Sequence, residues 1–222
     1  MIAIILPIIA VALGTIAAVI FKPSITHGVK LLLSFSGAFL LSIVIFELLP
    51  EVYGGSEENI GLFVIAGLMV QIFLEFGSKG AEHGHVHHKD NAKFPYLLFI
   101  SLCIHAFIEG FPIGEKSSLL YGVVVHKIPI AVIIATFLLT SKLSKVGAAI
   151  FLITFALMTP LGALVQATFP LLQEYSTYVN AFVIGVLLHV STTILFESSR
   201  NHQFNASKLA MILLGILIAY FI

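Results

Sequence analysis

Long apolar runs alternate with short polar stretches along the whole chain of 222 residues. Most runs approach the roughly 20 residues that a helix needs to cross the hydrocarbon core of a bilayer. They are continuously apolar, which excludes the alternating pattern of strands in a membrane β-barrel. The pattern therefore predicts eight membrane-spanning helices. Their expected ranges are residues 2–20, 31–49, 60–77, 95–114, 119–139, 147–169, 178–197 and 208–222.

The composition supports a membrane location for nearly the whole chain. Hydrophobic residues make up 59% of it, charged residues only 10%, and the mean hydropathy is +1.10. A soluble domain needs far more charge on its surface. We therefore expect an all-α integral membrane protein that forms a single transmembrane domain over residues 1–222. The net charge is zero with neutral histidines, so no nucleic-acid partner is expected.

Basic residues concentrate in alternate loops, which predicts the orientation of the helices. Nine of the eleven Lys and Arg residues follow the first, third, fifth and seventh runs: Lys22, Lys30, Lys79, Lys89, Lys93, Lys142, Lys145, Arg200 and Lys208. Because basic loops stay in the cytoplasm, both termini should face outward in a multi-pass protein of the cell membrane. The opposite loops carry carboxylates such as Glu51, which either concentrate cations at the outer mouth or only keep these loops soluble.

This topology also predicts an inverted repeat. The first three helices start outside and the last three start inside, so the two triplets run in opposite directions around a central pair, the fourth and fifth helices. Residues 36–40 (SGAFL) and 184–188 (IGVLL) are a faint counterpart in sequence. Inverted triplets of this kind occur in secondary transporters, which bind their substrates near the midplane. The sequence similarity alone is weak, because Gly and Leu are common in membrane helices.

A histidine-rich segment lies in the predicted cytoplasmic loop at about residues 78–94. Four histidines fall within six residues there: His83, His85, His87 and His88. Imidazole binds zinc and similar ions, and such tracts commonly hold metal loosely. We expect metal capture in this loop if the protein handles metal; the alternative is a solvated, flexible linker.

Four ionisable side chains interrupt the fourth and fifth apolar runs: His105, Glu109, His126 and Lys127. Ionisable groups inside a bilayer are expensive and usually mark a functional site. His105 and Glu109 are four residues apart, so they project from one face of a helix. His126 should lie at a comparable depth, because the fourth run ends and the fifth begins at the same short connection, and His105 and His126 each lie several residues from it. The pattern predicts a site in which His105, Glu109 and His126 bind one divalent cation.

A proline follows these residues in each run and predicts a kink there. Pro112 should free the carbonyl of Ile108, and Pro129 that of Val125, because proline has no N–H to donate. Unpaired carbonyls are tolerated at membrane depth where they line a cavity. We interpret the two prolines as part of a binding site; the alternative is a pair of purely structural kinks.

The paired motifs resemble those of the ZIP (Zrt/Irt-like) metal-ion transporters. Residues 105–110 (HAFIEG) match the family's His-x-x-x-Glu-Gly pattern, and residues 126–129 (HKIP) match its His-x-Ile-Pro pattern. Residues 48–51 (LLPE) and 160–163 (PLGA) are also similar to the family's, as are the histidine-rich loop and the eight-helix layout. The resemblance implies a transporter that moves divalent transition metals into the cytoplasm by rocking one helix group against the other around a midplane site.

Departures from the family pattern predict a site for a single metal. Ile130 stands where the family usually has a glutamate ligand. Ala106, Lys127 and Thr159 stand at positions that supply further ligands to a binuclear centre in some members. We therefore expect His105, Glu109 and His126 to bind one metal, with the Lys127 ammonium in place of the second.

Other residues are candidates for a fourth ligand or for the pathway. Glu47 lies where the family often has an acidic residue or histidine, and His189 lies within the seventh helix. Either of them, or water, could complete the site; for His189 a structural hydrogen bond to a neighbouring helix is an equal alternative. Glu51 and Glu197 are expected at the outer and cytoplasmic ends of the pathway, and Glu75 at the membrane interface.

Three functions are compatible with these residues. The first is transport of Zn²⁺, or of Fe²⁺, Mn²⁺, Co²⁺ or Cd²⁺, which all suit nitrogen and oxygen ligands with an open position. The metal is then the substrate, and no prosthetic group is expected. The second is a membrane-embedded zinc-dependent hydrolase, although the chain has no His-Glu-x-x-His motif. The third is a non-transporting metal sensor, because Ile130 and Lys127 replace family ligands. The sequence is also compatible with assembly as a homodimer.

Overall fold

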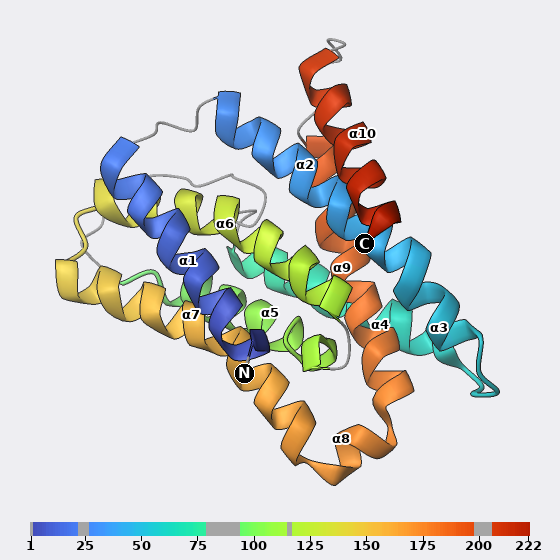
Figure 1. The fold of residues 1–222 in the computed structure, drawn as a ribbon. Coiled ribbons are helices and arrows are strands. Elements are labelled where there is room, and N and C mark those ends of the chain that lie inside the picture. The colour runs from blue at the N-terminus through green and yellow to red at the C-terminus, as the bar shows by residue number, and fades with distance from the viewer. Residues whose placement is uncertain (1, 22–26, 79–93, 115–116, 198–205) are drawn as a thin grey trace.

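The computed structural model describes residues 2–21, 27–78, 94–114, 117–197 and 206–222, and these residues are almost entirely helical, with no strand among them (Figure 1). The all-α prediction is confirmed. The long helices are α1 (Ile2–Phe21), α2 (His27–Ile43), α4 (Ile60–Ser78), α5 (Tyr96–Ile108), α6 (Ser117–Thr140), α7 (Lys145–Thr168), α9 (Ser176–Glu197) and α10 (Ala206–Phe221). Four short elements join or extend them: η1 (Val44–Leu48), α3 (Leu49–Tyr53), η3 (Phe111–Gly114) and α8 (Pro170–Glu174).

Seven helical segments within these ranges are long and apolar enough to cross a membrane. The eighth candidate, α10, has 16 residues. At a rise of 1.5 Å per residue it is about 24 Å long, which is less than the roughly 30 Å of a hydrocarbon core. The predicted integral membrane class therefore holds, whereas an eighth span stays a prediction.

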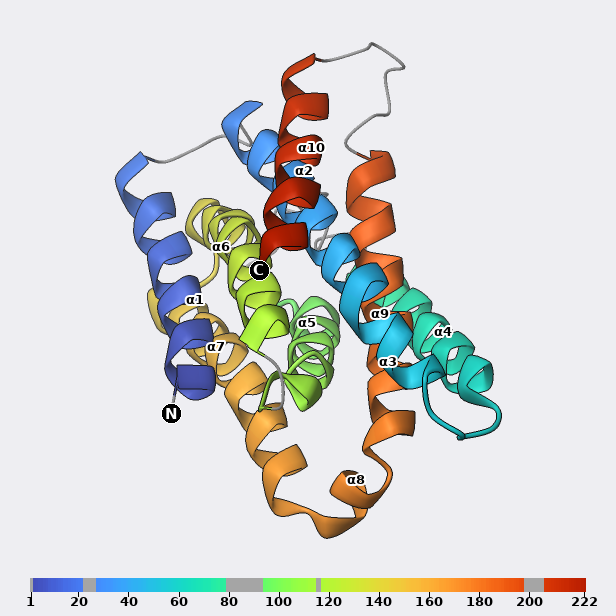
Figure 2. The same ribbon diagram turned by 45° about the vertical axis from the view of Figure 1, so that its right-hand side comes forward.

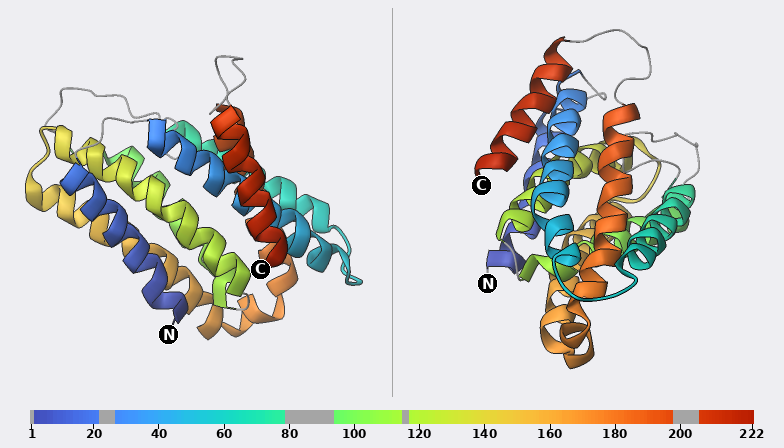
Figure 3. Two further views of the ribbon diagram at one scale, coloured as in Figure 1. Left: turned by 45° about the horizontal axis from the view of Figure 1, so that its top comes forward. Right: turned by 90° about the vertical axis from the view of Figure 1, so that its right-hand side faces the viewer.

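The helices form two groups that lie side by side (Figure 2). In the first group, α1 packs on α6 and α7, and α5 packs on α7. In the second group, α4 packs on α9, and α2 packs on α9 and α10. Contacts between α2 and α6 and between α4 and α5 join the two groups. Figure 3 shows the same helices from two further sides.

Within each helix group, and with α10 counted as the eighth span, the packing agrees with the predicted inverted repeat; the α2–α6 and α4–α5 contacts that join the groups have no counterpart of similar extent among the described residues. Exchanging the first three spans with the last three, and the fourth with the fifth, turns the α1–α6 contact into the α7–α5 contact. The same exchange turns the α4–α9 contact into the α10–α2 contact. Small residues permit such close helix packing in membranes. A Cβ on Gly67 of α4 would lie 1.8 Å from the Phe182 carbonyl oxygen of α9, so only glycine fits there.

Two predicted helices differ from the structure, and a proline lies at each difference. The fourth, expected as one kinked helix over residues 95–114, stops at Ile108 and resumes as the 3₁₀ turn η3, which contains Pro112. The second continues from His27 to Tyr53 through the π-helical turn η1, in which the Leu49 N–H donates to the Val44 carbonyl just before Pro50. By contrast, α6 stays helical through Pro129.

Candidate metal site

The four ionisable residues of the central motifs come together between α5 and α6. His105, Glu109, His126 and Lys127 are each at most 4% exposed. They line one cavity of about 10 Å³ with Leu102, Ile130 and Phe155. Because α5 packs mainly on α4 and α7, and α6 on α1 and α2, the two helices meet here through their polar side chains. The short connection predicted that α5 and α6 pack side by side, whereas each packs mainly on other helices and the two come together at these side chains.

The three predicted ligands lie close to one another. The His105 Nε2 atom is 3.5 Å from Glu109 Oε2, and the rings of His105 and His126 are 6.4 Å apart between centroids. Among the residues that the structure describes, however, no three His, Cys, Asp or Glu side chains are arranged closely enough to hold a metal ion as they stand. The side chains must shift for a metal to bind all three.

Lys127 contacts the predicted ligand Glu109. Its ammonium forms an ion pair with Glu109 Oε1 and lies 4.6 Å from the centroid of the Phe155 ring. The Thr159 hydroxyl is also within hydrogen-bonding distance of Glu109 Oε1, at 2.9 Å. The other carboxylate oxygen, Oε2, is buried and accepts no hydrogen bond from the described residues. Glu109 is therefore neutralised on one oxygen and turns the other toward His105.

Glycine contacts bring Thr159 to the carboxylate. A Cβ on Gly110 would lie 2.2 Å from the Thr159 carbonyl oxygen, and one on Gly162 would lie 2.0 Å from the Phe107 carbonyl oxygen. These two positions let the end of α5 contact the backbone of α7 directly. The residues that follow Glu109 and Pro160 in the two family-like motifs thus serve to place a hydroxyl beside the predicted metal ligand.

Gln71 is a site residue that the sequence interpretation missed. It lies fully buried on α4, and its side-chain oxygen is 3.0 Å from Nδ1 of His105. Because this oxygen can only accept, Nδ1 is assigned as the protonated nitrogen, which leaves the lone pair of Nε2 for a metal. Partners of this kind orient histidine ligands in metal sites. The sequence feature that could have indicated Gln71 is the presence of an amide side chain within the apolar run of residues 60–78.

The two candidates for a fourth ligand lie outside this cavity. Glu47, on η1, accepts a hydrogen bond from the Ser118 hydroxyl at the start of α6. His189, on α9, contacts the Glu75 carboxylate on α4 through Nε2. Glu75, expected at the membrane interface, is therefore half-buried between two helices.

The remaining predicted residues are less defined. Glu51 is exposed on α3. Glu197 ends α9, and its side chain is not among those described. The histidines proposed for loop capture, His83, His85, His87 and His88, lie outside the described residues.

Apolar helices around a buried cluster of ionisable groups define a multi-pass membrane protein with a buried polar site. A family model described as "ZIP Zinc transporter" matches residues 77–222. The chain therefore belongs to the ZIP zinc transporter family. It is also 30% identical over 114 residues to Zinc transporter ZIP1 of Plasmodium falciparum (isolate 3D7), a match that covers 48% of this chain and 32% of that relative. The match thus spans about a third of the relative's length. Members of this family are transporters rather than enzymes, so the hydrolase alternative loses its support.

Proposed function

We propose that the protein moves divalent transition-metal ions, Zn²⁺ first, into the cytoplasm through a site formed by His105, Glu109 and His126. The observation that carries the proposal is the Glu109 carboxylate. It is 1% exposed, and its Oε2 atom accepts no hydrogen bond from the described residues while facing an imidazole nitrogen at 3.5 Å. Buried acceptors without donors are rare in proteins, and imidazole and carboxylate together suit Zn²⁺.

The same geometry makes Lys127 a competitor of the metal. A charge of +1 and one of +2 that lie 4 Å apart repel by on the order of 8 kcal/mol at an effective dielectric constant of 20. The ammonium must therefore leave Glu109 Oε1 when a metal arrives. We propose a single-metal site in which Lys127 occupies the carboxylate between transport events, lowers the affinity and helps release.

The two helix groups supply a means of exposing the site to each side in turn. His105, Glu109, His126 and Lys127 belong to the group of α1, α5, α6 and α7, whereas Gln71 on α4 belongs to the other. A rocking movement between the groups would act on the Gln71–His105 hydrogen bond. The family resemblance supports inward transport. The predicted orientation then has Glu47 and Glu51 on the outer side and the Glu75–His189 pair and Glu197 toward the cytoplasm. Water then completes the coordination.

Purified protein in sealed proteoliposomes tests the proposal. We expect saturable uptake of Zn²⁺, and of at least one of Fe²⁺, Mn²⁺, Co²⁺ and Cd²⁺, above that of protein-free vesicles, with Mg²⁺ as the control ion that prefers oxygen ligands. Imposed pH and voltage gradients identify any coupling. Metal binding without flux would instead indicate the sensor, and no binding would contradict the proposed site.

Replacing Gln71 with leucine should weaken metal binding while the helices stay packed. The substitution removes the acceptor that orients the His105 ring, and losses of such partners typically cost about 10-fold to 100-fold in metal affinity. We expect the Zn²⁺ concentration for half-maximal uptake to rise by that factor. Gln166→Leu is the matched control, because Gln166 is also buried but donates to the Leu172 carbonyl, away from the site. Equal effects of the two substitutions would contradict an orienting role.

A further inference from the structure

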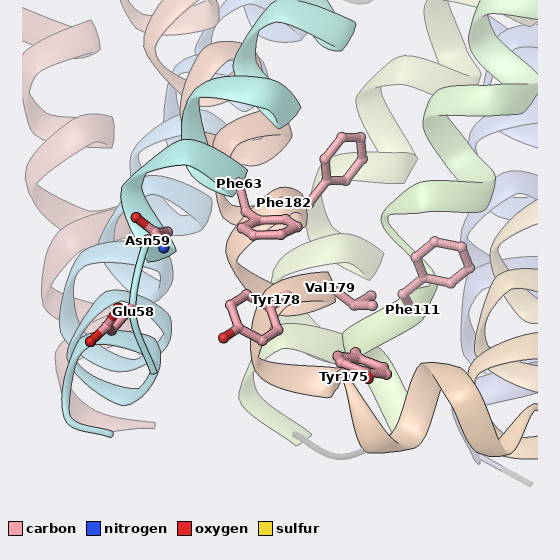
Figure 4. Close-up of a pocket in the computed structure, with 8 residues that line it drawn as sticks. All are labelled: Glu58, Asn59, Phe63, Phe111, Tyr175, Tyr178, Val179 and Phe182. Carbon is pink, nitrogen blue, oxygen red and sulfur yellow. The ribbon is translucent and has the colours of Figure 1, made fainter. Parts of the chain in front are cut away.

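A pocket of about 580 Å³ lies at one end of α4 and α9, separate from the metal cluster (Figure 4). Five of its eight lining residues are aromatic: Phe63, Phe111, Tyr175, Tyr178 and Phe182. They come from α4, α9, η3 and the residue between α8 and α9, and they surround the hollow in the close-up. None of the eight lining residues is basic.

The edge of this pocket is acidic and polar. Glu58 and Asn59 lie at the start of α4 and line it. The neighbouring Glu57 carboxylate accepts a hydrogen bond of 3.4 Å from the Thr177 hydroxyl at the start of α9, which ties this edge to the second wall. A carboxylate at the mouth and no basic residue in the lining favour a positively charged ligand.

The inner part of the pocket is aromatic and firmly built. The rings of Phe63 and Tyr178 are 4.7 Å apart between centroids, and those of Tyr175 and Tyr178 are 6.3 Å apart. Just beyond Phe63, the Gly67 position meets the Phe182 backbone, so α4 and α9 cannot separate without losing that contact. Aromatic faces attract ammonium groups, and their area accommodates an apolar chain.

We propose that this pocket binds an amphipathic ammonium compound. Its ammonium lies at the acidic edge beside Glu58 and the tyrosine rings, and its apolar part packs on Phe63, Phe111 and Phe182. Two sources share this chemistry: a phospholipid with a choline or ethanolamine head group, and a free amphipathic amine. The helix start places Glu58 near the membrane surface and Phe63 about one turn deeper, which matches the direction of such a molecule in a bilayer.

Occupancy of the pocket should restrain the movement proposed above, and this consequence alone rests on the proposed function. Phe111 lies on η3, two residues after Glu109, and lines the pocket. The turn η3 packs on α7, which belongs to the same helix group as the metal cluster. The other rings belong to α4 and α9 or directly precede α9. A bound molecule therefore bridges the two helix groups, so we expect it to slow metal uptake.

Binding without metal tests the site independently of transport. The probe is a fluorescent dodecyl-trimethylammonium compound, compared with its uncharged analogue in which carbon replaces the nitrogen, in nanodiscs of phosphatidylglycerol. We expect the ammonium probe to bind the unmodified protein more tightly than the neutral analogue. Glu58→Gln and Tyr178→Leu should each weaken it about tenfold. The matched controls are Glu51→Gln and Tyr96→Leu, which change an exposed carboxylate and an exposed tyrosine outside the pocket.

The comparison of lipids identifies the source, and the variants decide the proposal. Weaker probe binding in phosphatidylcholine nanodiscs supports a lipid occupant, and equal binding supports a free amine. Equal binding of the neutral analogue, or binding that Glu58→Gln and Tyr178→Leu leave unchanged, overturns the proposal. Slower Zn²⁺ uptake with the probe in the unmodified protein but not in Tyr178→Leu would confirm the effect on movement. If the protein binds the probe but transports no metal, the proposed ligand pocket is supported and only the proposed transport function is contradicted.

Discussion

We expect Glu109→Gln to abolish saturable metal uptake in proteoliposomes while the protein still inserts into the membrane. The substitution replaces the one carboxylate of the buried cluster with an amide, which is a much weaker ligand for Zn²⁺. His126→Ala should have the same effect, because it removes the ligand that α6 contributes. Glu174→Gln is the control, since Glu174 is an exposed carboxylate on α8, outside the buried cluster. Normal uptake by either site variant would show that the proposed site is wrong.

Glu109→Gln removes both a proposed metal ligand and the counter-ion of Lys127, and a measurement of protein stability distinguishes these two effects. Glu109→Gln leaves the Lys127 ammonium buried without its carboxylate, and breaking a buried ion pair typically costs about 3–5 kcal/mol. We expect a lower unfolding midpoint, measured by thermal denaturation in detergent. Adding Lys127→Met should restore much of the stability, because no buried charge then remains, but should not restore uptake. Recovery of uptake in the double variant would exclude Glu109 as a ligand.

Lys127→Met alone should raise the affinity for metal and slow its release. Without the ammonium, the buried Glu109 carboxylate has no competing cation, so Zn²⁺ replaces the lost charge. We expect at least about a tenfold fall in the Zn²⁺ concentration for half-maximal uptake, which corresponds to 1.4 kcal/mol or more, and a lower maximal rate. Zn²⁺ should also raise the unfolding midpoint of this variant more than that of the unmodified protein.

The control for Lys127→Met is Lys145→Met, which changes an exposed lysine at the start of α7. This control should leave both kinetic parameters and the choice of metal unchanged. Unchanged kinetics and selectivity in Lys127→Met itself would remove the role of Lys127 as a substitute cation.

The proximity of His105, Glu109 and His126 could be predicted because it depends on local rules. Residues four apart share a helix face, and the fourth and fifth runs meet at one short connection, which places His105 and His126 at comparable depth. The contact between His189 and Glu75 could not be predicted in this way. The two residues are 114 positions apart, and only the packing of α4 on α9 brings them together. His189 was therefore open as a ligand or a structural residue until its neighbour was known.

The chain by itself determined the membrane class, the order of the helices and the central cluster of ionisable residues, because hydrophobicity and helix periodicity act over neighbouring residues. It also showed, through Ile130 and Lys127, where this cluster departs from the family pattern. Only the tertiary structure decided that Lys127 pairs with Glu109, that Gln71 orients His105, and that Glu47 and His189 lie away from the cavity. These contacts depend on which helices pack together and at what depth. That packing includes close backbone approaches at glycines such as Gly67 and Gly162, whose partners lie far away in sequence.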